Sequence, residues 1–180
     1  SKRLDDNQMI IAKDDWVNAQ GQLDALTRSQ AIIEFDLHGN ILIANDNFLN
    51  ALGYSLEEVQ GKHHSIFVDN KYRNSREYKE FWAKLGSGEF QSGEFCRYSK
   101  DGEAVWIEAS YNPIFDDNNK PYKVVKFATD ITEKKKQKEQ HTRRAFSDSK
   151  EMLDACYISM TRRRNLFHAR IGINNQLDGN

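Results

Sequence analysis

Apolar and polar residues alternate along several short stretches of the chain, and this alternation predicts β-strands. The clearest case is 104–112, where Val105, Ile107, Ala109 and Tyr111 take every second position. Four more segments have a strand-like pattern and are bounded by turn residues. The five predicted strands are 31–36, 41–44, 93–99, 104–115 and 121–131.

Two turn signals place neighbouring strands in hairpins. Gly39-Asn40 separates the first two predicted strands, and Lys100-Asp101-Gly102 separates the third from the fourth. Glycine accepts the positive φ angles that tight hairpin turns need. The strands are therefore expected to pair antiparallel.

Helical signals fill the segment between the second and third strands. Asn45 is placed to cap a helix over 46–52, and Ser55 and Glu58 have the spacing of a capping box. Ser75 is placed to cap a third helix, whose apolar residues recur at helical spacing. That face comprises Tyr78, Phe81, Trp82 and Leu85.

These elements predict an α+β fold: a five-stranded antiparallel sheet with short helices across one face, flanked by N- and C-terminal helices. Residues 1–30 form the first flanking helix, and its apolar residues are spaced as in a coiled coil. We expect this stripe to pack against the outer face of the sheet or to form a homodimer seam. The stripe comprises Met9, Ala12, Trp16, Ala19, Leu23 and Leu26.

The C-terminal part reads as a connector helix. The stretch 134–144 has almost no apolar residue and is interpreted as a solvated helix, and apolar residues return from Phe146. The similarity of 177–180 to 37–40 hints at the start of a second module. The predicted organisation is 1–28 N-terminal helix, 29–132 folded domain and 133–180 connector with that possible second module.

Composition limits the functional classes. The formal net charge is −1, so no bulk field favours nucleic acid. Cys96 and Cys156 lack the spacing of a disulfide framework or a CxxC site, which fits a reducing, cytoplasmic setting. No apolar run approaches the roughly 20 residues that span a bilayer, and we predict no direct membrane contact. No phosphate-binding loop, HExxH or nucleophile elbow is present in the sequence, so we predict that the chain is not an enzyme.

Over residues 24–133 the sequence resembles a PAS domain, a sensory module of bacterial signalling proteins. The resemblance rests on Gly53-Tyr54-Ser55, on Lys100-Asp101-Gly102 before Val105, and on Asp130-Ile131-Thr132. A narrower resemblance is to the PAS domains of methyl-accepting, aerotaxis-type chemoreceptors. It is carried by 61–64, 81–82, 88–93, 109–113 and 123–128.

This resemblance implies a cofactor site, because some members of the group hold FAD non-covalently, others hold haem b, and others have no known cofactor. Trp82 and Asn45 match flavin-pocket residues of the group, and we expect Asn112 to present its amide from the inner sheet. Each has a structural alternative: packing of a helical face for Trp82, N-capping for Asn45 and a strand-end turn for Asn112. Phe48, Val125 and Phe127 are expected to supply apolar walls, with Asn45, His64 and Asn112 as polar contacts.

His63 and His64 are the remaining candidates. Adjacent helical residues point about 100° apart and rarely ligate one metal together, so no metal site is expected. A single axial imidazole suffices for haem, which keeps either histidine open for that cofactor. Light-sensing relatives carry cysteine where this chain has His64, so no cysteinyl–flavin adduct is expected.

The expected function is that of a cytoplasmic sensory module, which detects redox state or oxygen through a bound cofactor. We expect this cofactor to be FAD. We expect it to signal through its C-terminal helix to an effector domain in the same chain, such as a methyl-accepting chemotaxis domain. The alternatives are a haem-based gas sensor and a cofactor-free PAS domain that dimerises or docks a partner.

Overall fold

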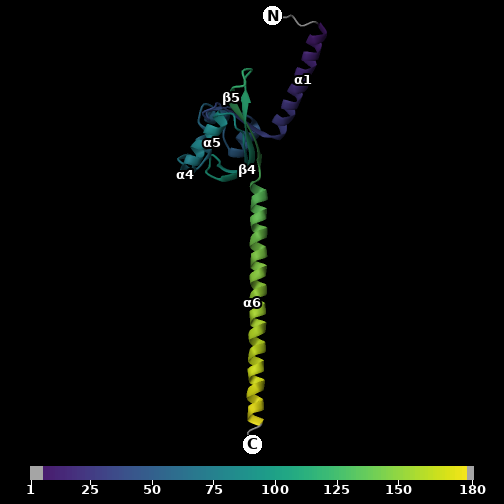
Figure 1. The fold of residues 1–180 in the computed structure, drawn as a ribbon, viewed down its shortest axis with the longest axis vertical. Coiled ribbons are helices and arrows are strands. Elements are labelled where there is room, and N and C mark those ends of the chain that lie inside the picture. The colour runs from purple at the N-terminus through teal and green to yellow at the C-terminus, as the bar shows by residue number, and fades with distance from the viewer. Residues whose placement is uncertain (1–5, 178–180) are drawn as a thin grey trace. The chain divides into compact units, whose positions relative to one another are not determined.

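A five-stranded antiparallel sheet forms the framework of the folded domain (Figure 1). The computed structural model describes residues 6–177, and the side chains of residues 8–164. The spatial strand order is β2-β1-β5-β4-β3, and every neighbouring pair is antiparallel. The predicted α+β architecture is confirmed. The strands are β1 Ala31–Phe35, β2 Ile41–Ala44, β3 Gln91–Tyr98, β4 Ala104–Phe115 and β5 Pro121–Asp130.

Short helices between β2 and β3 cover the inner face of the sheet, as expected. Sequence periodicity missed two of them, η1 and α4, because each spans only four residues and a single turn cannot show helical periodicity. The helices are α2 Asp46–Leu52, α3 Leu56–Val59, the 3₁₀ helix η1 His64–Phe67, α4 Asn70–Arg73 and α5 Arg76–Gly86.

The predicted caps are present. The Ser75 hydroxyl accepts from the Tyr78 amide at 3.1 Å at the start of α5. Ser55 and Glu58 form the capping box of α3, in which the Glu58 carboxylate accepts from the Ser55 amide at 2.9 Å. Gly53 ends α2 with a φ of 74°, which is strained for residues that carry a Cβ. Local sequence thus determines where these short helices begin and end.

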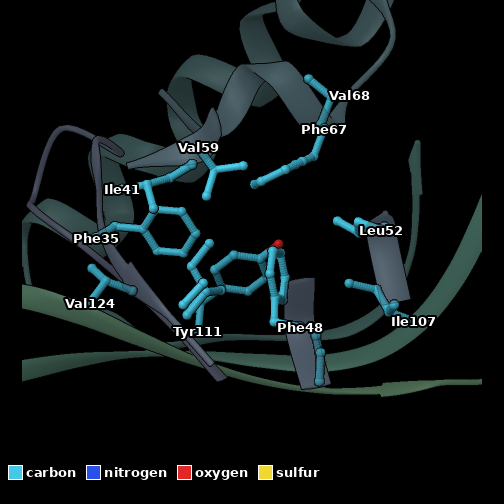
Figure 2. Close-up of a cluster of buried hydrophobic side chains, with 14 of the residues drawn as sticks. Phe35, Ile41, Phe48, Leu52, Val59, Phe67, Val68, Ile107, Tyr111 and Val124 are labelled. Carbon is cyan, nitrogen blue, oxygen red and sulfur yellow. The ribbon is translucent and has the colours of Figure 1, made fainter. Parts of the chain in front are cut away.

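The core lies between these helices and the inner face of the sheet. Figure 2 shows side chains from strands and helices converging there, among them Phe35, Tyr111 and Phe67. Phe35, Phe67 and Tyr111 are fully buried. Aromatic rings supply much of the buried area, and they meet mainly edge to face.

Helix α1 (Asp6–Ser29) does not bury its apolar stripe within this chain. Met9 is 57% exposed, Trp16 65% and Leu23 55%. Of the two predicted environments, packing on the chain's own sheet is therefore wrong. Burial against a second copy stays a prediction.

Helix α6 (Thr132–Leu177) is a single 46-residue element. Backbone contacts divide the chain into one unit that ends at Thr132 and another that begins at Glu133. Side chains from 136 to 160 are exposed in this chain. The predicted second module rested on 177–180, most of which lies outside the described residues. Among the helices that the structure describes, none is both long and apolar enough to cross a membrane.

Candidate functional site

The turn after β1 holds the two histidines in place. The Gly39 carbonyl oxygen accepts a hydrogen bond from the His64 amide at 2.8 Å, and Asn40 forms a β-bridge with His63. Gly39 has a φ of 88°, and a Cβ there would lie 2.7 Å from His63 Nε2 and 2.9 Å from Trp82 Cε2. Only glycine permits this close approach, which packs the turn against the side chains of His63 and Trp82.

His64 sits at the centre of a buried hydrogen-bonded network. Its Nδ1 lies 2.9 Å from the Tyr78 hydroxyl and its Nε2 lies 3.1 Å from the Tyr111 hydroxyl. Arg97 Nη2 donates to the same Tyr111 oxygen at 3.0 Å. Because arginine only donates, Tyr111 is free to donate its own proton to His64 Nε2, and His64 Nδ1–H then donates to Tyr78.

Burial controls the protonation of this network. It holds the pKa of His64 well below 6.5, and the nearby charges of Arg97 and Lys126 add to the effect. Burial also raises the pKa of Tyr78 to about 12. The network is therefore neutral at His64 and at both tyrosines near pH 7.

Two further cations lie in the same core. Lys126 is fully buried, and its Nζ lies 4.8 Å from the centroid of the Tyr111 ring and 5.3 Å from that of Phe48. Arg97 is 3% exposed, with its guanidinium carbon 4.9 Å from the centroid of the Phe95 ring. Burial holds the pKa of Lys126 well below its usual value, and the charge of Arg97 lowers it further.

Three buried donor atoms in the described part of the chain have no hydrogen-bond partner: Trp82 Nε1, Arg97 Nε and Lys126 Nζ. A buried donor without an acceptor is costly, and few occur in a native domain. All three belong to side chains of the core between α5 and the sheet. This core therefore has unused capacity to donate hydrogen bonds.

Trp82 lies where this core meets the surface. Its ring is 5.3 Å from that of Phe35 and 5.4 Å from that of His64, centroid to centroid. It lines two separate surface hollows. The first is bounded by Leu37, His38, Trp82, Ala83 and Gly86, and the second by His63, Ser65, Arg73, Tyr78, Lys79 and Trp82.

The Asn45 side chain is already fully engaged. Its Oδ1 accepts from the amides of Ile32 at 2.9 Å and Phe48 at 3.0 Å. Its Nδ2 donates to the carbonyls of Thr27 at 3.1 Å and Gln30 at 2.8 Å. Asn45 thus caps α2 and ties it to the end of α1, which is the structural alternative considered for this residue.

Three of the predicted pocket residues lie on the other face of the sheet. Lys126 points into the core, so the strand's two-residue period directs Val125 and Phe127 to the outer face. Asn112 lies on that outer face too, where its Nδ2 donates to Ser110 Oγ at 3.0 Å and to the Val125 carbonyl at 3.2 Å. Their predicted position on the inner wall is therefore wrong, whereas Phe48, His64 and Trp82 do lie together in the core.

Sequence reasoning overlooked the residues that make this core unusual, namely Arg97, Lys126 and Tyr111. Lys126 interrupts the otherwise apolar segment 124–128 of β5. The prediction placed Val125 and Phe127 on the inner face, and the strand period then put Lys126 on the solvent side, where lysine usually lies. The structure shows the other arrangement. Val124, Lys126 and Ala128 share one face of β5, and all three are buried.

Neither histidine has a free ring nitrogen in this arrangement. His63 Nδ1 accepts from the Ser65 amide at 3.0 Å, and its Nε2 lies 2.8 Å from the His38 carbonyl oxygen. Both nitrogens of His64 contact tyrosine hydroxyls. Within the described residues, no group of three or more His, Cys, Asp and Glu side chains is arranged to hold a metal ion.

Comparison with known proteins bears on the segment that builds this site. A family model described as the PAS fold matches residues 41–128. The biofilm dispersion protein BdlA of Pseudomonas aeruginosa is 49% identical over 115 residues, which cover 64% of this chain and 28% of BdlA. The aerotaxis receptor of Escherichia coli is 33% identical over 79 residues, which cover 44% of this chain and 15% of the receptor. The chain thus spans less than a third of either relative.

Solved structures agree on the fold. A PAS domain from Colwellia psychrerythraea superposes with a TM-score of 0.56 at 24% identity, over 64% of this chain and 98% of that one. A light-oxygen-voltage domain superposes with a TM-score of 0.54 at 20% identity, over 69% and 95%. With the sheet order and helices described above, these matches show that residues 41–128 belong to the PAS family, and that the chain carries a PAS sensory domain related to those of chemotaxis and aerotaxis sensors.

Proposed function

We propose that this PAS domain binds a flavin, FAD in the first instance, between α5 and the inner face of the sheet, and that it senses redox state or oxygen. The observation that carries the proposal is the environment of Trp82. Its indole is buried in an aromatic core, lines two surface hollows and has an unpaired Nε1 donor. A flavin offers a flat ring for stacking and acceptor atoms along its edge.

The residues proposed to contact the flavin are Phe48, His64 and Trp82. Phe48 and Trp82 provide ring surfaces, and neutral His64 provides a hydrogen-bonding group held by Tyr78 and Tyr111. The sequence also suggested Asn45, Asn112 and Phe127. Their positions support other roles: Asn45 fixes the start of α2, while Asn112 and Phe127 belong to the outer face.

Two similar proteins support a flavin. One is named an aerotaxis receptor, and a structural neighbour is a light-oxygen-voltage domain whose mechanism was probed with a flavin analogue. When bound, a flavin supplies reversible redox chemistry accompanied by changes in charge and protonation. His64, Tyr78 and Tyr111 form a polar network in the core where we propose that the flavin binds. A change in the charge or protonation of the flavin would therefore act on this network.

Haem is the weaker candidate because of the histidine contacts. Axial ligation needs a free imidazole nitrogen, and each ring nitrogen of His63 and His64 is engaged. Ligation by His64 would break a buried bond to Tyr78 or Tyr111. A cofactor-free docking domain remains the second alternative.

The proposed output route begins where β5 ends. Thr132 Oγ1 accepts from the Trp106 amide at 2.9 Å, and the Trp106 carbonyl accepts from the Ile131 amide at 2.8 Å. The first residue of α6 is thereby tied to β4, the strand that carries Tyr111. A shift of β4 would act directly on the start of α6, and through it on an effector such as a methyl-accepting chemotaxis domain. In the assembly we propose, two copies associate through the apolar stripes of their terminal helices.

The first test is an absorption spectrum of the purified protein, followed by titration of cofactor-free protein with FAD. We expect flavin bands and saturable binding. Trp82→Ala should weaken FAD binding, whereas Phe127→Ala on the outer face serves as the matched control and should not. A Soret band in the spectrum would identify the cofactor as haem instead of flavin. Binding of neither cofactor would favour the cofactor-free alternative.

A further inference from the structure

We propose that the inner core of this domain binds a small organic carboxylate, whose oxygens bridge Arg97 and Lys126. This site goes beyond the flavin proposal and does not require a flavin. It rests on two buried cationic side chains that have spare donors and no anionic partner in the described structure.

Lys126 is the first half of the site. It projects inward from β5 opposite Tyr111 of β4, and Nζ lies against the rings of Phe48 and Tyr111. These rings contact the ammonium group only through their faces, and Nζ has no hydrogen-bond partner. In the charged form, all three of its donors are therefore available to a ligand.

Arg97 is the second half. Its Nη1 donates to the Cys96 carbonyl at 2.9 Å and its Nη2 to the Tyr111 hydroxyl at 3.0 Å, which fixes the guanidinium plane. The Nε donor stays buried and unpaired. Because Arg97 and Lys126 both contact Tyr111, their spare donors belong to one locality.

Neither Arg97 nor Lys126 forms an ion pair with an acidic side chain of the described residues. The buried polar side chains among the described residues are His64, Arg97 and Lys126, with no Asp or Glu. Burying an unpaired cation is expensive, and one of the few circumstances that maintains it is a ligand of opposite charge. Burial lowers the pKa of Lys126, so without a ligand the side chain can relieve this cost by losing its proton, and an anion beside it would favour the charged form again.

A carboxylate fits these donors better than other anions. It is planar, carries a single charge, and presents two oxygens that can accept from different donors. The surroundings are closely packed aromatic rings, which suit a small organic group rather than a bulky, doubly charged phosphate. The Arg97 guanidinium lies over the Phe95 ring, and Phe95 also lines a surface hollow whose rim carries Glu77, Glu80 and Lys84.

The closing experiment titrates cofactor-free protein with acetate and with pyruvate by calorimetry, at constant ionic strength. Lys126→Met should weaken binding about 10- to 100-fold, since it removes a charged donor. Lys123→Met is the matched control, because Lys123 lies on the same strand but pairs with Glu34 at 2.8 Å. The control should bind like the parent.

Proton uptake gives a second readout that a purely structural lysine would not produce. An anion beside Lys126 raises its pKa, so binding should take up protons wherever the unliganded lysine is deprotonated, and it should weaken as pH rises. Arg97, Tyr111 and His64 also face this locality, but Lys126→Met alone should abolish the uptake. We expect the measured enthalpy to depend on buffer ionisation in the parent and not in the variant.

Two results would overturn the proposal. In the first, neither carboxylate binds, while FAD binds and loses affinity in Lys126→Met; the cations then serve the flavin, and the proposed function stands without this site. In the second, acetate or pyruvate binds parent and variant equally. Carboxylate binding that is lost in Lys126→Met supports the site even if FAD fails to bind.

Discussion

The two faces of the sheet distribute charge and apolar surface against the usual pattern. The inner face carries Lys126 and Arg97 among buried aromatic rings. The outer face carries Phe127 and Val125, and its ion pair, Glu34–Lys123, is only partly buried. In β5 a lysine thus faces the core while apolar side chains face outward, which is the reverse of the usual arrangement. A ligand on the inner face, as proposed above, would account for this contrast.

The largest expected difference between the faces concerns packing. Phe35→Ala should lower the free energy of unfolding by about 3–5 kcal/mol, because Phe35 is fully buried and the cavity cannot refill. Phe127→Ala on the half-buried outer face should cost only about 1 kcal/mol. Urea denaturation of both variants measures this. Equal losses would mean that the outer face is covered in solution.

The second difference concerns the two lysines of β5. Lys126→Met should raise the free energy of unfolding of the ligand-free domain by about 1–4 kcal/mol, since it replaces a buried amine, whose charged form burial disfavours and whose donors are unpaired, by an apolar chain. Lys123→Met should change it by about 1 kcal/mol or less.

The pH dependence gives the sign of the Lys126 effect. The folded-state pKa of Lys126 is depressed below 10.5, so the unfolded chain binds more protons and the parent gains stability as pH rises toward 10.5. The advantage of Lys126→Met should therefore shrink at high pH. An advantage that stays constant from pH 7 to 10 would contradict a buried titrating lysine.

A third, smaller effect belongs to His64. Its folded-state pKa lies well below 6.5, so below that pH the unfolded chain takes up a proton that the folded chain does not. The free energy of unfolding should then fall with pH from about 6.5 downwards, at up to about 1.4 kcal/mol per pH unit. His64→Asn, although less stable overall, should lack this slope between about pH 5 and 6.5. Thermal or urea melts across that range measure it.

The smallest effect on the folded chain is expected at α1. Trp16 is exposed, so Trp16→Glu should change the stability of the isolated monomer by about 0.5 kcal/mol or less. Its effect should appear instead in self-association, which sedimentation measures. A variant that associates like the parent would remove α1 from the proposed dimer.

The order and pairing of the elements could be predicted because they depend on local signals. Gly39 and Gly102 mark the hairpin turns, and Asn45, Ser55 and Ser75 mark the helix starts. Each signal acts within a few residues, so the sequence shows it directly.

The candidate site could be predicted only in part, because it depends on contacts between distant residues. The alternation in β5 gives the period of the strand and leaves open which set of residues faces the core. Choosing the more apolar set placed Val125 and Phe127 inward, and this was wrong. Trp82 was singled out because helical spacing places it on the apolar face of α5, whereas His64 was named from the family resemblance, since η1 is too short to show a period.

The tie between Trp106 and Thr132 has a mechanical consequence for the helix that it anchors. A 46-residue helix is about 70 Å long at 1.5 Å per residue. A rigid rod of that length turns a 5° change of direction at its first turn into a displacement of about 6 Å at its far end. A strand movement too small to disturb the packed core would thus displace the far end of α6 by about the pitch of one helical turn.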